Sequence, residues 1–351
     1  MSADISIGSY VIGSGRPAFV IAEAGVNHNA SELMAIDLIR QAKKSGANCV
    51  KFQTFKADRV VTSNAPKARY QRVTTDSKQS QLEMLRALEL PEHIYGDLIT
   101  LCDAESIIFT STPYNEEDID FLRETGVKVL KSASMHLAEP RFLQRLAETG
   151  LPLIVSTGMA NWNEIDEAVD AIRSTGNDQF VLLQCTTNYP SCLADTNLNA
   201  MVAMRDRKNC LVGYSDHTQS HIPCLGAIAL GATVIEKHFT LDKKLSGPDH
   251  TTSETPDGFG KLVNGIRDME TALGLREKSP TNAECANMTE MRRSIAVRYA
   301  LPAGHIIAER DLTYKRPASG IAPRLWTKLI GLRTVREIPA DSLLAWTDVD
   351  D

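Results

Sequence analysis

Eight short apolar runs recur at regular intervals through most of this 351-residue chain. The majority consist of nearly continuous Val, Ile, Leu and Phe, which is typical of parallel strands buried on both faces. The runs are residues 18–25, 49–55, 107–113, 127–134, 152–158, 180–190, 211–218 and 234–241.

Helical patterns separate these runs. In residues 31–46, for example, Ser31 is placed to cap a helix and Gly46 to end it. The apolar face of this helix is predicted to comprise Leu33, Ile36, Leu38 and Ile39. Eight alternating strand and helix units predict a (β/α)8 barrel of the TIM type.

A doubly wound sheet is the alternative fold. It would have fewer strands and a glycine-rich turn directly after the first strand. In this chain Gly13 and Gly15 precede the first apolar run, so we interpret them as part of an ordinary turn.

The composition narrows the class of protein. A content of 43% hydrophobic and 23% charged residues is that of a globular protein. The net charge of -6 and the pI of about 5.8 argue against nucleic-acid and anionic-membrane surfaces, but a small anionic substrate needs only a local cluster of Lys and Arg. The seven cysteines are scattered without a CxxC pair, which fits reduced thiols. With no secretory leader and no long apolar stretch, we expect a soluble, cytoplasmic protein.

Every strand-like run ends in polar residues, which a barrel would gather at its C-terminal mouth, where active sites of this fold lie. The two-residue period of a strand places three pairs of them on common faces: Lys51 with Gln53, Ser215 with His217, and Glu236 with His238.

His217, in the motif GYSDHT, and His238, in the motif EKHF, lie one strand–helix unit apart. Neighbouring parallel strands are about 4.8 Å apart, so two imidazoles at equivalent strand ends can reach one ion. A site with two imidazoles and open positions suits Mn²⁺ or Mg²⁺ acting as a Lewis acid better than a closed zinc site. Two unrelated polar strand ends are the alternative interpretation.

Lys51 and Lys131 end the second and fourth runs, with hydroxyl groups around them. In an acidic protein this set indicates a clamp for phosphate or carboxylate. A Schiff-base lysine is the competing interpretation, but it leaves the histidines without a role. Glu23, at the end of the first run, is the candidate acid/base or water-positioning group.

The C-terminal part of the sequence does not continue the alternation of strand and helix patterns. Residues 276–290 are polar and are predicted to form a linker. Residues 301–312 (LPAGHIIAERDL) then recur as residues 338–349 (IPADSLLAWTDV). This repeat indicates a small pseudo-symmetric β domain, which is marginal for burying its own core and so is expected to dock on another surface.

Several motifs together resemble the sialic acid synthase family. They are AEAGVNHN from Ala22, VKFQT from Val50, GYSDHT from Gly213, EKHFTLD from Glu236 and GPDH from Gly247. The tail, with Lys315-Arg316-Pro317 and its repeat, resembles the antifreeze-like (SAF) domain of these proteins. The resemblance implies a barrel over residues 1–275, a linker over 276–290 and a SAF domain over 291–351.

The resemblance also implies an activity and a set of site residues. The activity is condensation of phosphoenolpyruvate with N-acetylmannosamine or a related N-acetylamino sugar, releasing phosphate, in a domain-swapped homodimer. His217 and His238 match metal ligands, and Glu23 an essential carboxylate. The positions that match phosphoenolpyruvate contacts are Lys51, Thr112, Lys131, Ser134, Ser156, Thr187 and Ser215. Those that match sugar contacts are Gln53, Tyr189, Asp249 and Arg316, with Arg316 supplied by the second subunit.

Two positions depart from the family pattern. His136 stands two residues after Ser134, where relatives carry an acid, and we expect it to help select the sugar. Thr187 replaces a Ser or Asn. The retained Pro248-Asp249-His250 looks more like sialic or legionaminic acid synthases than pseudaminic ones.

Two alternative functions are compatible with parts of this pattern. A 3-deoxy sugar-acid phosphate synthase of the octulosonate or heptulosonate type uses the same donor, but its phosphorylated acceptor needs a second basic clamp, and none is evident among the strand ends. A non-catalytic sugar-sensing barrel protein is the other, and the intact Glu23, both lysines and both histidines argue against it.

Overall fold

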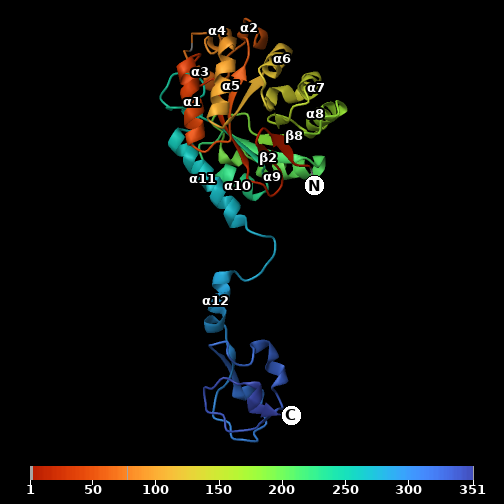
Figure 1. The fold of residues 1–351 in the computed structure, drawn as a ribbon, viewed down its shortest axis with the longest axis vertical. Helices are drawn as coiled ribbons and strands as arrows, with labels where there is room; N and C mark the ends of the chain where they lie inside the picture. The colour runs from red at the N-terminus through yellow and green to blue at the C-terminus, as the bar shows by residue number, and fades with distance from the viewer. Residues whose placement is uncertain (1–2, 77, 351) are drawn as a thin grey trace. The chain divides into compact units, whose positions relative to one another are not determined.

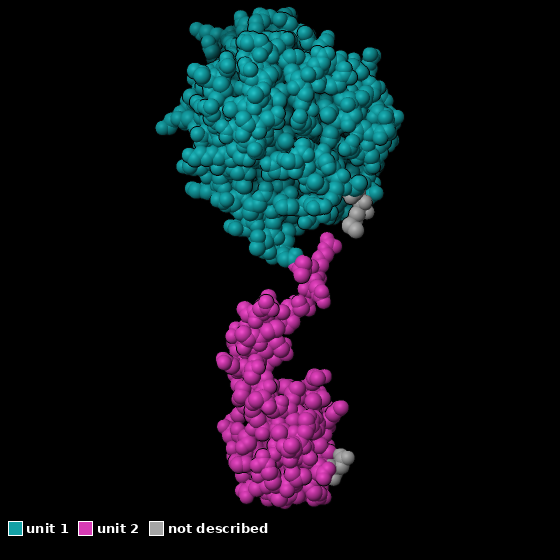
Figure 2. All heavy atoms as spheres, viewed as in Figure 1, with its two compact units in different colours: residues 1–274 teal, residues 275–351 magenta. Residues whose placement is uncertain are grey.

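The computed structural model describes residues 3–76 and 78–350. The chain divides into two compact units, residues 1–274 and residues 275–351 (Figure 2).

The first unit is an eight-stranded parallel barrel, which confirms the predicted fold class. Its strands are β3 (Phe19–Gly25), β4 (Cys49–Thr54), β5 (Ile108–Pro113), β6 (Leu130–Ser132), β7 (Leu153–Ser156), β8 (Phe180–Cys185), β9 (Leu211–Asp216) and β10 (Val234–His238). Their order is β5-β4-β3-β10-β9-β8-β7-β6, and each lies within one of the eight apolar runs. The barrel is nearly closed between β5 and β6, where the Thr110 hydroxyl donates to the Val129 carbonyl at 2.7 Å.

Helices surround the strands (Figure 1). They are α1 (Glu32–Lys44), α5 (Tyr95–Ala104), α6 (Glu116–Glu124), α7 (Pro140–Glu148), α8 (Trp162–Ser174), α9 (Leu198–Lys208), α10 (Ile222–Ala229) and α11 (Pro256–Leu273). The helix α11 packs against both α1 and α10, so it joins the end of the barrel to its beginning.

The predicted helix over residues 31–46 is α1. The Ser31 hydroxyl accepts from the Met34 N–H at 3.3 Å, and Gly46 follows the helix with a φ of +86°. One part of the prediction is wrong: Leu33 is 75% exposed, because the buried stripe runs through Ala35, Leu38, Ile39 and Ala42.

The N-terminal residues form a hairpin that the sequence patterns did not reveal. Strands β1 (Ile5–Ile7) and β2 (Tyr10–Ile12) pair antiparallel. Ile5, Ile7 and Ile12 are buried in one cluster with residues from the first halves of the barrel strands. These contacts close the N-terminal end of the barrel. Burial of each isoleucine side chain contributes about 1.5–3 kcal/mol to the stability of the folded state. The turn over Gly13 to Arg16 follows, as expected.

A long excursion separates β4 from α5. It contains the short helices α2 (Ala57–Val60), α3 (Arg69–Thr74), α4 (Gln81–Arg86) and η1 (Glu92–Ile94). Its apolar side chains pack on the first β–α loop, with Met84 and Leu88 buried against Val26 and Phe55. Three further 3-10 turns lie in the first unit: η2 (Ser134–Ala138), η3 (Leu193–Asp195) and η4 (His250–Thr252).

The second unit begins with a helix inside the segment predicted as a linker. The helix α12 (Asn282–Met291) starts at a capping box in which Thr281 and Glu284 bond each other's backbone N–H groups at 3.2 Å and 2.7 Å. The Thr and Asn residues interpreted as linker therefore mark a helix start.

The rest of this unit is built from β11 (Ser294–Val297), β12 (Leu312–Lys315), β13 (Arg333–Thr334), β14 (Val349–Asp350) and the turns η5 (Glu309–Asp311), η6 (Pro323–Lys328) and η7 (Trp346–Asp348). The two copies of the sequence repeat have equivalent structures. Leu301 and Ile338, their first residues, exchange backbone hydrogen bonds at 2.9 Å and 2.8 Å. Asp311 and Asp348 occupy the same position in each copy and accept from Ala308 and Ala345 N–H groups. The repeat is thus a real structural duplication.

Among the described residues, no helix is both long and apolar enough to cross a membrane.

Candidate active site

A cavity of about 320 Å³ opens at the C-terminal ends of the barrel strands. All eight strands, or the residue following them, contribute to its lining. The strand residues are Glu23, Lys51, Gln53, Thr112, Lys131, Ser156, Cys185, Ser215, Glu236 and His238, and the loop residues include Ser134, Tyr189, His217 and Asp249. The predicted pairing on common strand faces is confirmed, because Lys51 with Gln53, Ser215 with His217, and Glu236 with His238 all face this cavity.

Lys51 lies between two carboxylates in the floor of the cavity. Its Nζ is 2.9 Å from Glu23 Oε2 and 3.5 Å from Glu236 Oε2, and it donates to the Thr112 hydroxyl at 3.3 Å. Burial alone would lower the pKa of Lys51, but Glu23 and Glu236 raise it above its usual value. Lys51 is therefore a fixed cation.

Glu23 is the least stabilised carboxylate of this group. Burial raises its pKa to about 7, against the opposing attraction of Lys51, and the Glu236 carboxylate adds to the rise. Gln53 donates to Glu23 Oε1 at 3.1 Å. Glu23 can therefore gain or lose a proton near neutral pH, as a catalytic acid or base must.

Glu236 and Lys131 form the second half of the floor. Glu236 accepts from the Ser215 hydroxyl at 3.0 Å and lies 4.0 Å from Lys131 Nζ. Burial opposes its ionisation, but Lys131 and Lys51 lower its pKa to about 2. Lys131 donates to the Ser156 hydroxyl at 2.5 Å, and burial lowers its pKa to about 8, while Glu236 acts in the opposite direction.

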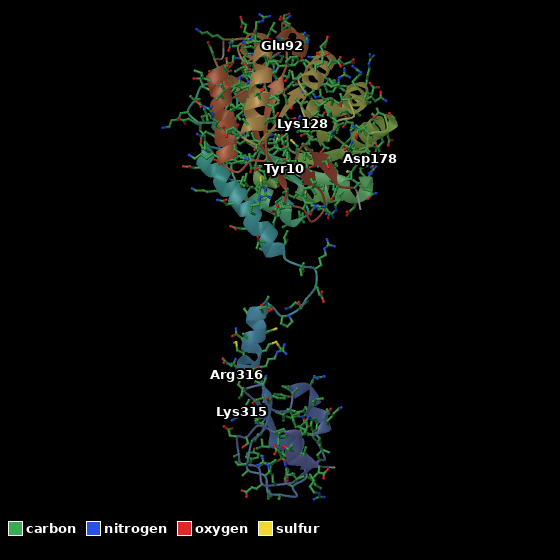
Figure 3. All side chains as sticks on the ribbon, in the orientation of Figure 1. Tyr10, Glu92, Lys128, Asp178, Lys315 and Arg316 are labelled. Carbon is green, nitrogen blue, oxygen red and sulfur yellow. The ribbon has the colours of Figure 1, made fainter. Side chains whose placement is uncertain are left out.

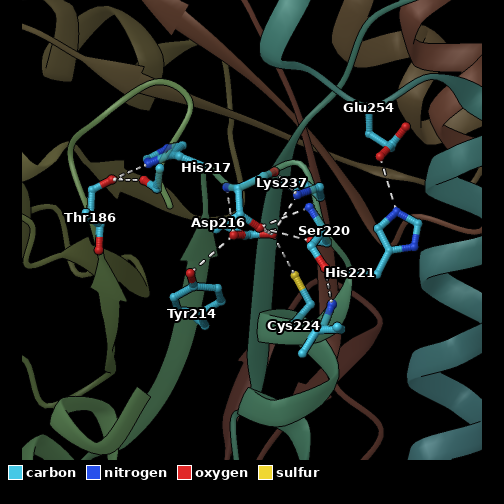
Figure 4. A network of polar contacts seen from close by, with 12 residues as sticks. Thr186, Tyr214, Asp216, His217, Ser220, His221, Cys224, Lys237 and Glu254 are labelled. Carbon is cyan, nitrogen blue, oxygen red and sulfur yellow. Dashed lines mark hydrogen bonds and ion pairs between the residues drawn. The ribbon is translucent and has the colours of Figure 1, made fainter. Parts of the chain in front are cut away.

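The two histidines lie side by side at the ends of the adjacent strands β9 and β10, with ring centroids 5.3 Å apart. His217 Nδ1 donates to the Thr186 carbonyl at 2.8 Å, so in the neutral ring Nε2 carries the lone pair (Figure 4). Burial lowers the pKa of His238 well below its usual value, so this ring is neutral. The Tyr189 ring lies 4.1 Å from His217 and 5.6 Å from His238.

This part of the cavity fits a divalent cation with an open coordination sphere. His238 Nδ1 and Asp249 Oδ1 are buried and have no hydrogen-bond partner in the part of the chain that the structure describes. His238 Nδ1 lies 4.0 Å from Asp249 Oδ2. His217 and His238 would supply two imidazoles to an ion here and leave its remaining positions open to water or substrate. Within residues 3–76 and 78–350, no group of three His, Cys, Asp or Glu side chains is arranged to hold a metal.

Two of the predicted site residues in the first unit, Thr187 and His136, are not part of this lining. Thr187 is exposed and lines a neighbouring cavity, although its hydroxyl group is close to Gly158 and the Ser134 hydroxyl. His136 is fully buried and stacks on Phe142, with ring centroids 4.2 Å apart. His136 packs against the ring of Tyr114, which lines the cavity. His136 itself is not part of the lining, so its side chain is not placed to contact a sugar in the cavity.

Arg316 belongs to the second unit, where it is exposed (Figure 3). It follows β12 and precedes Ala318, whose N–H donates to the Thr289 carbonyl of α12 at 2.7 Å.

Several lining residues were missed by the sequence patterns. Tyr70, on α3, stacks on Tyr189 with centroids 5.0 Å apart, and the Tyr114 hydroxyl donates to Gln53 Oε1 at 3.0 Å. The excursion also supplies an apolar wall, which together with Val26 comprises Val60, Val61, Met84, Leu85 and Leu88. The search for polar residues at strand ends could not identify most of these residues, because they are apolar or lie on helices inserted between β4 and α5.

Comparison with known proteins identifies relatives of this chain. A model of the NeuB family matches residues 38–278, and a model of the SAF domain matches residues 292–350. The chain is 43% identical to N,N'-diacetyllegionaminic acid synthase of Legionella pneumophila over 96% of each chain. It is 40% identical to the synthase of the same name from Campylobacter jejuni, over 94% of this chain and 99% of that one.

A solved structure is similar as well. The N-acetylneuraminic acid (sialic acid) synthetase from Leptospira borgpetersenii, determined in complex with citrate, matches with a TM-score of 0.73 and 31% identity. The match covers 82% of this chain and 95% of that one. The protein therefore belongs to the NeuB family and carries a C-terminal SAF domain.

Proposed function

We propose that this protein is a nonulosonic acid synthase, which joins phosphoenolpyruvate to an N-acetylamino sugar and releases phosphate. The observation that carries the proposal is that two buried lysines, three buried carboxylates and two histidines line one cavity at the barrel mouth. This set matches the charges of the donor and of the reaction, and the relatives named as nonulosonic acid synthases support the same activity.

The donor anion would bind at the floor of the cavity. Lys51 and Lys131 provide the positive charge, and the hydroxyl groups of Thr112, Ser134, Ser156 and Ser215 provide short hydrogen-bond donors around them. Because both ammonium groups are already held by carboxylates or hydroxyls, they need little reorganisation when phosphate charge develops.

His217 and His238 would hold a divalent cation, Mn²⁺ or Mg²⁺. When bound, such an ion supplies Lewis-acid polarisation of the open-chain sugar aldehyde. C3 of phosphoenolpyruvate attacks that aldehyde carbon to form the new C–C bond. Water adds at C2, and the resulting tetrahedral centre loses phosphate with cleavage of the C–O bond.

Glu23 is the group we assign to the proton transfers. Its carboxylate lies 2.9 Å from Lys51 Nζ, beside the proposed donor site, and its pKa of about 7 allows it to take a proton from the attacking water. Asp249, Gln53 and Tyr189 line the same cavity and are assigned to the sugar.

We further propose that the sugar is a 6-deoxy, 4-acetamido relative of N-acetylmannosamine. The wall formed by Val26, Val60, Val61, Met84, Leu85 and Leu88 suits a methyl group and an acetamido methyl, although Gln71 and Gln81 of the same excursion also line the cavity. Each buried methyl or methylene contributes about 0.8 kcal/mol. The names of the two relatives reported above favour the same class of acceptor.

Phosphate release from phosphoenolpyruvate tests both levels of the proposal. The panel comprises N-acetylmannosamine, its 6-deoxy-4-acetamido analogue, a pseudaminic acid precursor and arabinose 5-phosphate. Release with an N-acetylamino sugar but not with the sugar phosphate is expected, with kcat/KM highest for the 6-deoxy-4-acetamido sugar by about 10-fold or more. Release with none of these sugars would contradict the synthase, and a higher kcat/KM for N-acetylmannosamine would contradict the acceptor class.

A matched pair of variants probes the wall itself. Met84→Gln keeps the side-chain length but adds a polar group to the wall, and it should reduce the preference for the 6-deoxy sugar. Val73→Asn, on the same excursion but 83% exposed and outside the lining, should leave the preference unchanged.

A further inference from the structure

The hydrogen-bonded ladder between β9 and β10 ends where Asp216 is paired with Lys237. The next residue on each strand is a histidine of the cavity. From there the two backbones bond to different loops: the His217 carbonyl accepts from Ser191 N–H at 2.9 Å and the His238 carbonyl from Glu254 N–H at 2.7 Å. The Asp216–Lys237 pair is thus the last point of the β9–β10 ladder before the histidines.

Neither side chain of this pair lines the cavity, and the two contact each other beside His217 (Figure 4). Lys237 Nζ donates to Asp216 Oδ2 at 2.5 Å and to the Thr218 carbonyl at 2.8 Å. Asp216 accepts from the Thr218 N–H at 3.0 Å and from its hydroxyl at 3.2 Å. The residues before and after His217 are therefore both tied to the residue that precedes His238.

Further donors complete the network. The Tyr214 hydroxyl donates to Asp216 Oδ1 at 3.2 Å and the Cys224 thiol to Oδ2 at 3.4 Å. Asp216 is 1% exposed and Lys237 is 3% exposed. A buried ion pair contributes little stability compared with apolar side chains of similar volume, because both charges must be desolvated. Stability alone is therefore a poor explanation for this pair.

We infer that Asp216 and Lys237 are positioning residues, which fix the spacing and orientation of His217 and His238 and thereby the affinity of this site for a divalent cation. The inference rests on the proposed metal site. Neither side chain lines the cavity. Their effect is exerted through the backbone of His217, which they hold from both sides.

The test measures Mn²⁺ binding to metal-stripped, full-length protein, by the electron paramagnetic resonance signal of free Mn²⁺. Asp216→Asn and Lys237→Met should each raise the Mn²⁺ Kd by about 10-fold to 100-fold, the range found when partners of metal ligands are removed. The KM for phosphoenolpyruvate at saturating Mn²⁺ should stay near the parent value, because Lys51 and Lys131 are not part of the network.

Each single variant leaves one buried charge without its partner, which could prevent folding. Two further variants avoid this problem. Asp216→Asn combined with Lys237→Met leaves no unpaired charge. Thr218→Val removes only the hydroxyl from a buried residue and should raise the Kd by a smaller factor. Glu270→Gln is the structural control, since Glu270 accepts from the Ala18 N–H at 2.6 Å at the opposite end of β3 and should not alter Mn²⁺ binding.

The possible failures are distinguishable. If His217→Ala abolishes Mn²⁺ binding while the folded Asp216, Lys237 and Thr218 variants bind as the parent does, the positioning inference is overturned and the metal site stands. If His217→Ala binds Mn²⁺ as tightly as the parent, the metal site itself is overturned, and the inference with it.

Discussion

Glu23 and Lys51 are register partners on the adjacent strands β3 and β4, and their charged atoms lie 2.9 Å apart in the buried floor of the cavity. The pair is asymmetric, because Lys51 is also attracted by Glu236 whereas Glu23 is repelled by it. The pKa values of both groups are raised, with different consequences. Lys51 stays positively charged, whereas Glu23 can exchange a proton near neutral pH.

The first prediction concerns the pH dependence of catalysis. With a pKa of about 7, Glu23 is mostly protonated below that pH, so kcat/KM should rise about tenfold per pH unit on the acid side and level off above about 7. Glu23→Gln should lower kcat by about 10²-fold to 10⁴-fold and remove this acid limb. Retention of the same limb in the variant would assign it to another group.

The second prediction concerns the metal. Chelation should abolish phosphate release, and added Mn²⁺ should restore it. His217→Ala and His238→Ala should each lower kcat by several orders of magnitude, because the aldehyde would lose its Lewis acid. Thorough metal removal that leaves full activity would contradict the two-histidine site. His221→Ala is a matched control, since His221 bonds Glu254 outside the cavity lining.

The third prediction separates an anion clamp from a Schiff base. Lys51→Met and Lys131→Met should weaken phosphoenolpyruvate binding or turnover, since each removes one positive charge from the donor site. Borohydride should trap no adduct in the presence of pyruvate or the sugar. Lys131 is the critical case, because burial lowers its pKa to about 8 and so brings its amine closer to a nucleophilic state. A trapped adduct detected on Lys131 by mass spectrometry would favour the imine mechanism.

The strands and most of the cavity floor were predictable for a physical reason. A strand buried on both faces needs contiguous apolar residues, and the two-residue period then determines which terminal side chains share the mouth. This rule correctly grouped Ser215 with His217 and Glu236 with His238. The rule applies only to residues in or directly after regular strands.

His136 illustrates that limit. Strand β6 ends at Ser132, and residues 134–138 turn into a 3-10 helix, so the side chain two positions after Ser134 points into the packing against Phe142. Tyr70 illustrates the same limit, because it lines the cavity although it lies outside the strands. Its place in the site depends on contacts between segments distant in sequence, such as its stacking on Tyr189. Neither arrangement leaves a periodic signal.

The fourth prediction follows from the burial of His136. Burial lowers its pKa from 6.5 to about 4, so between these values the unfolded chain binds a proton that the folded chain does not. The contribution to stability is therefore complete above pH 6.5 and is lost as the pH falls towards 4, by about 1.4 kcal/mol per pH unit. Urea unfolding at pH 7, 6 and 5 measures this slope as the difference between the parent and a His136 variant, because His28 and His250 have pKa values lowered to about 4 as well.

The matched variants are His136→Gln and the exposed His93→Gln. The first should reduce the loss of stability between pH 7 and pH 5, whatever its effect on stability at pH 7, and the second should not. His136→Gln should also leave the ranking of sugars by kcat/KM unchanged, because Tyr114 lies in front of His136 in the cavity wall. A changed ranking would restore His136 to the sugar site.

The last prediction is that the active unit is a dimer in which the SAF domain of one subunit completes the site of the other. The described residues that line the barrel cavity include no arginine, and Arg316, exposed in the second unit, has the donor geometry that an N-acetyl oxygen or a carboxylate needs. The second unit also leaves Tyr299, Ile306 and Trp346 about half exposed, which would favour docking.

Mixing inactive Arg316→Ala subunits with inactive Glu23→Gln subunits tests this arrangement. If Arg316 acts in trans, one site of each mixed dimer combines an intact Glu23 with an intact Arg316, and the other site has neither. Subunit exchange should then restore up to half of the activity of an intact dimer per mixed dimer. Arg310→Ala, a nearby surface change, should be active without mixing. If exchange is verified by mass spectrometry and no activity returns, Arg316 acts within its own subunit or outside the site, and each barrel must bind its sugar with its own residues alone.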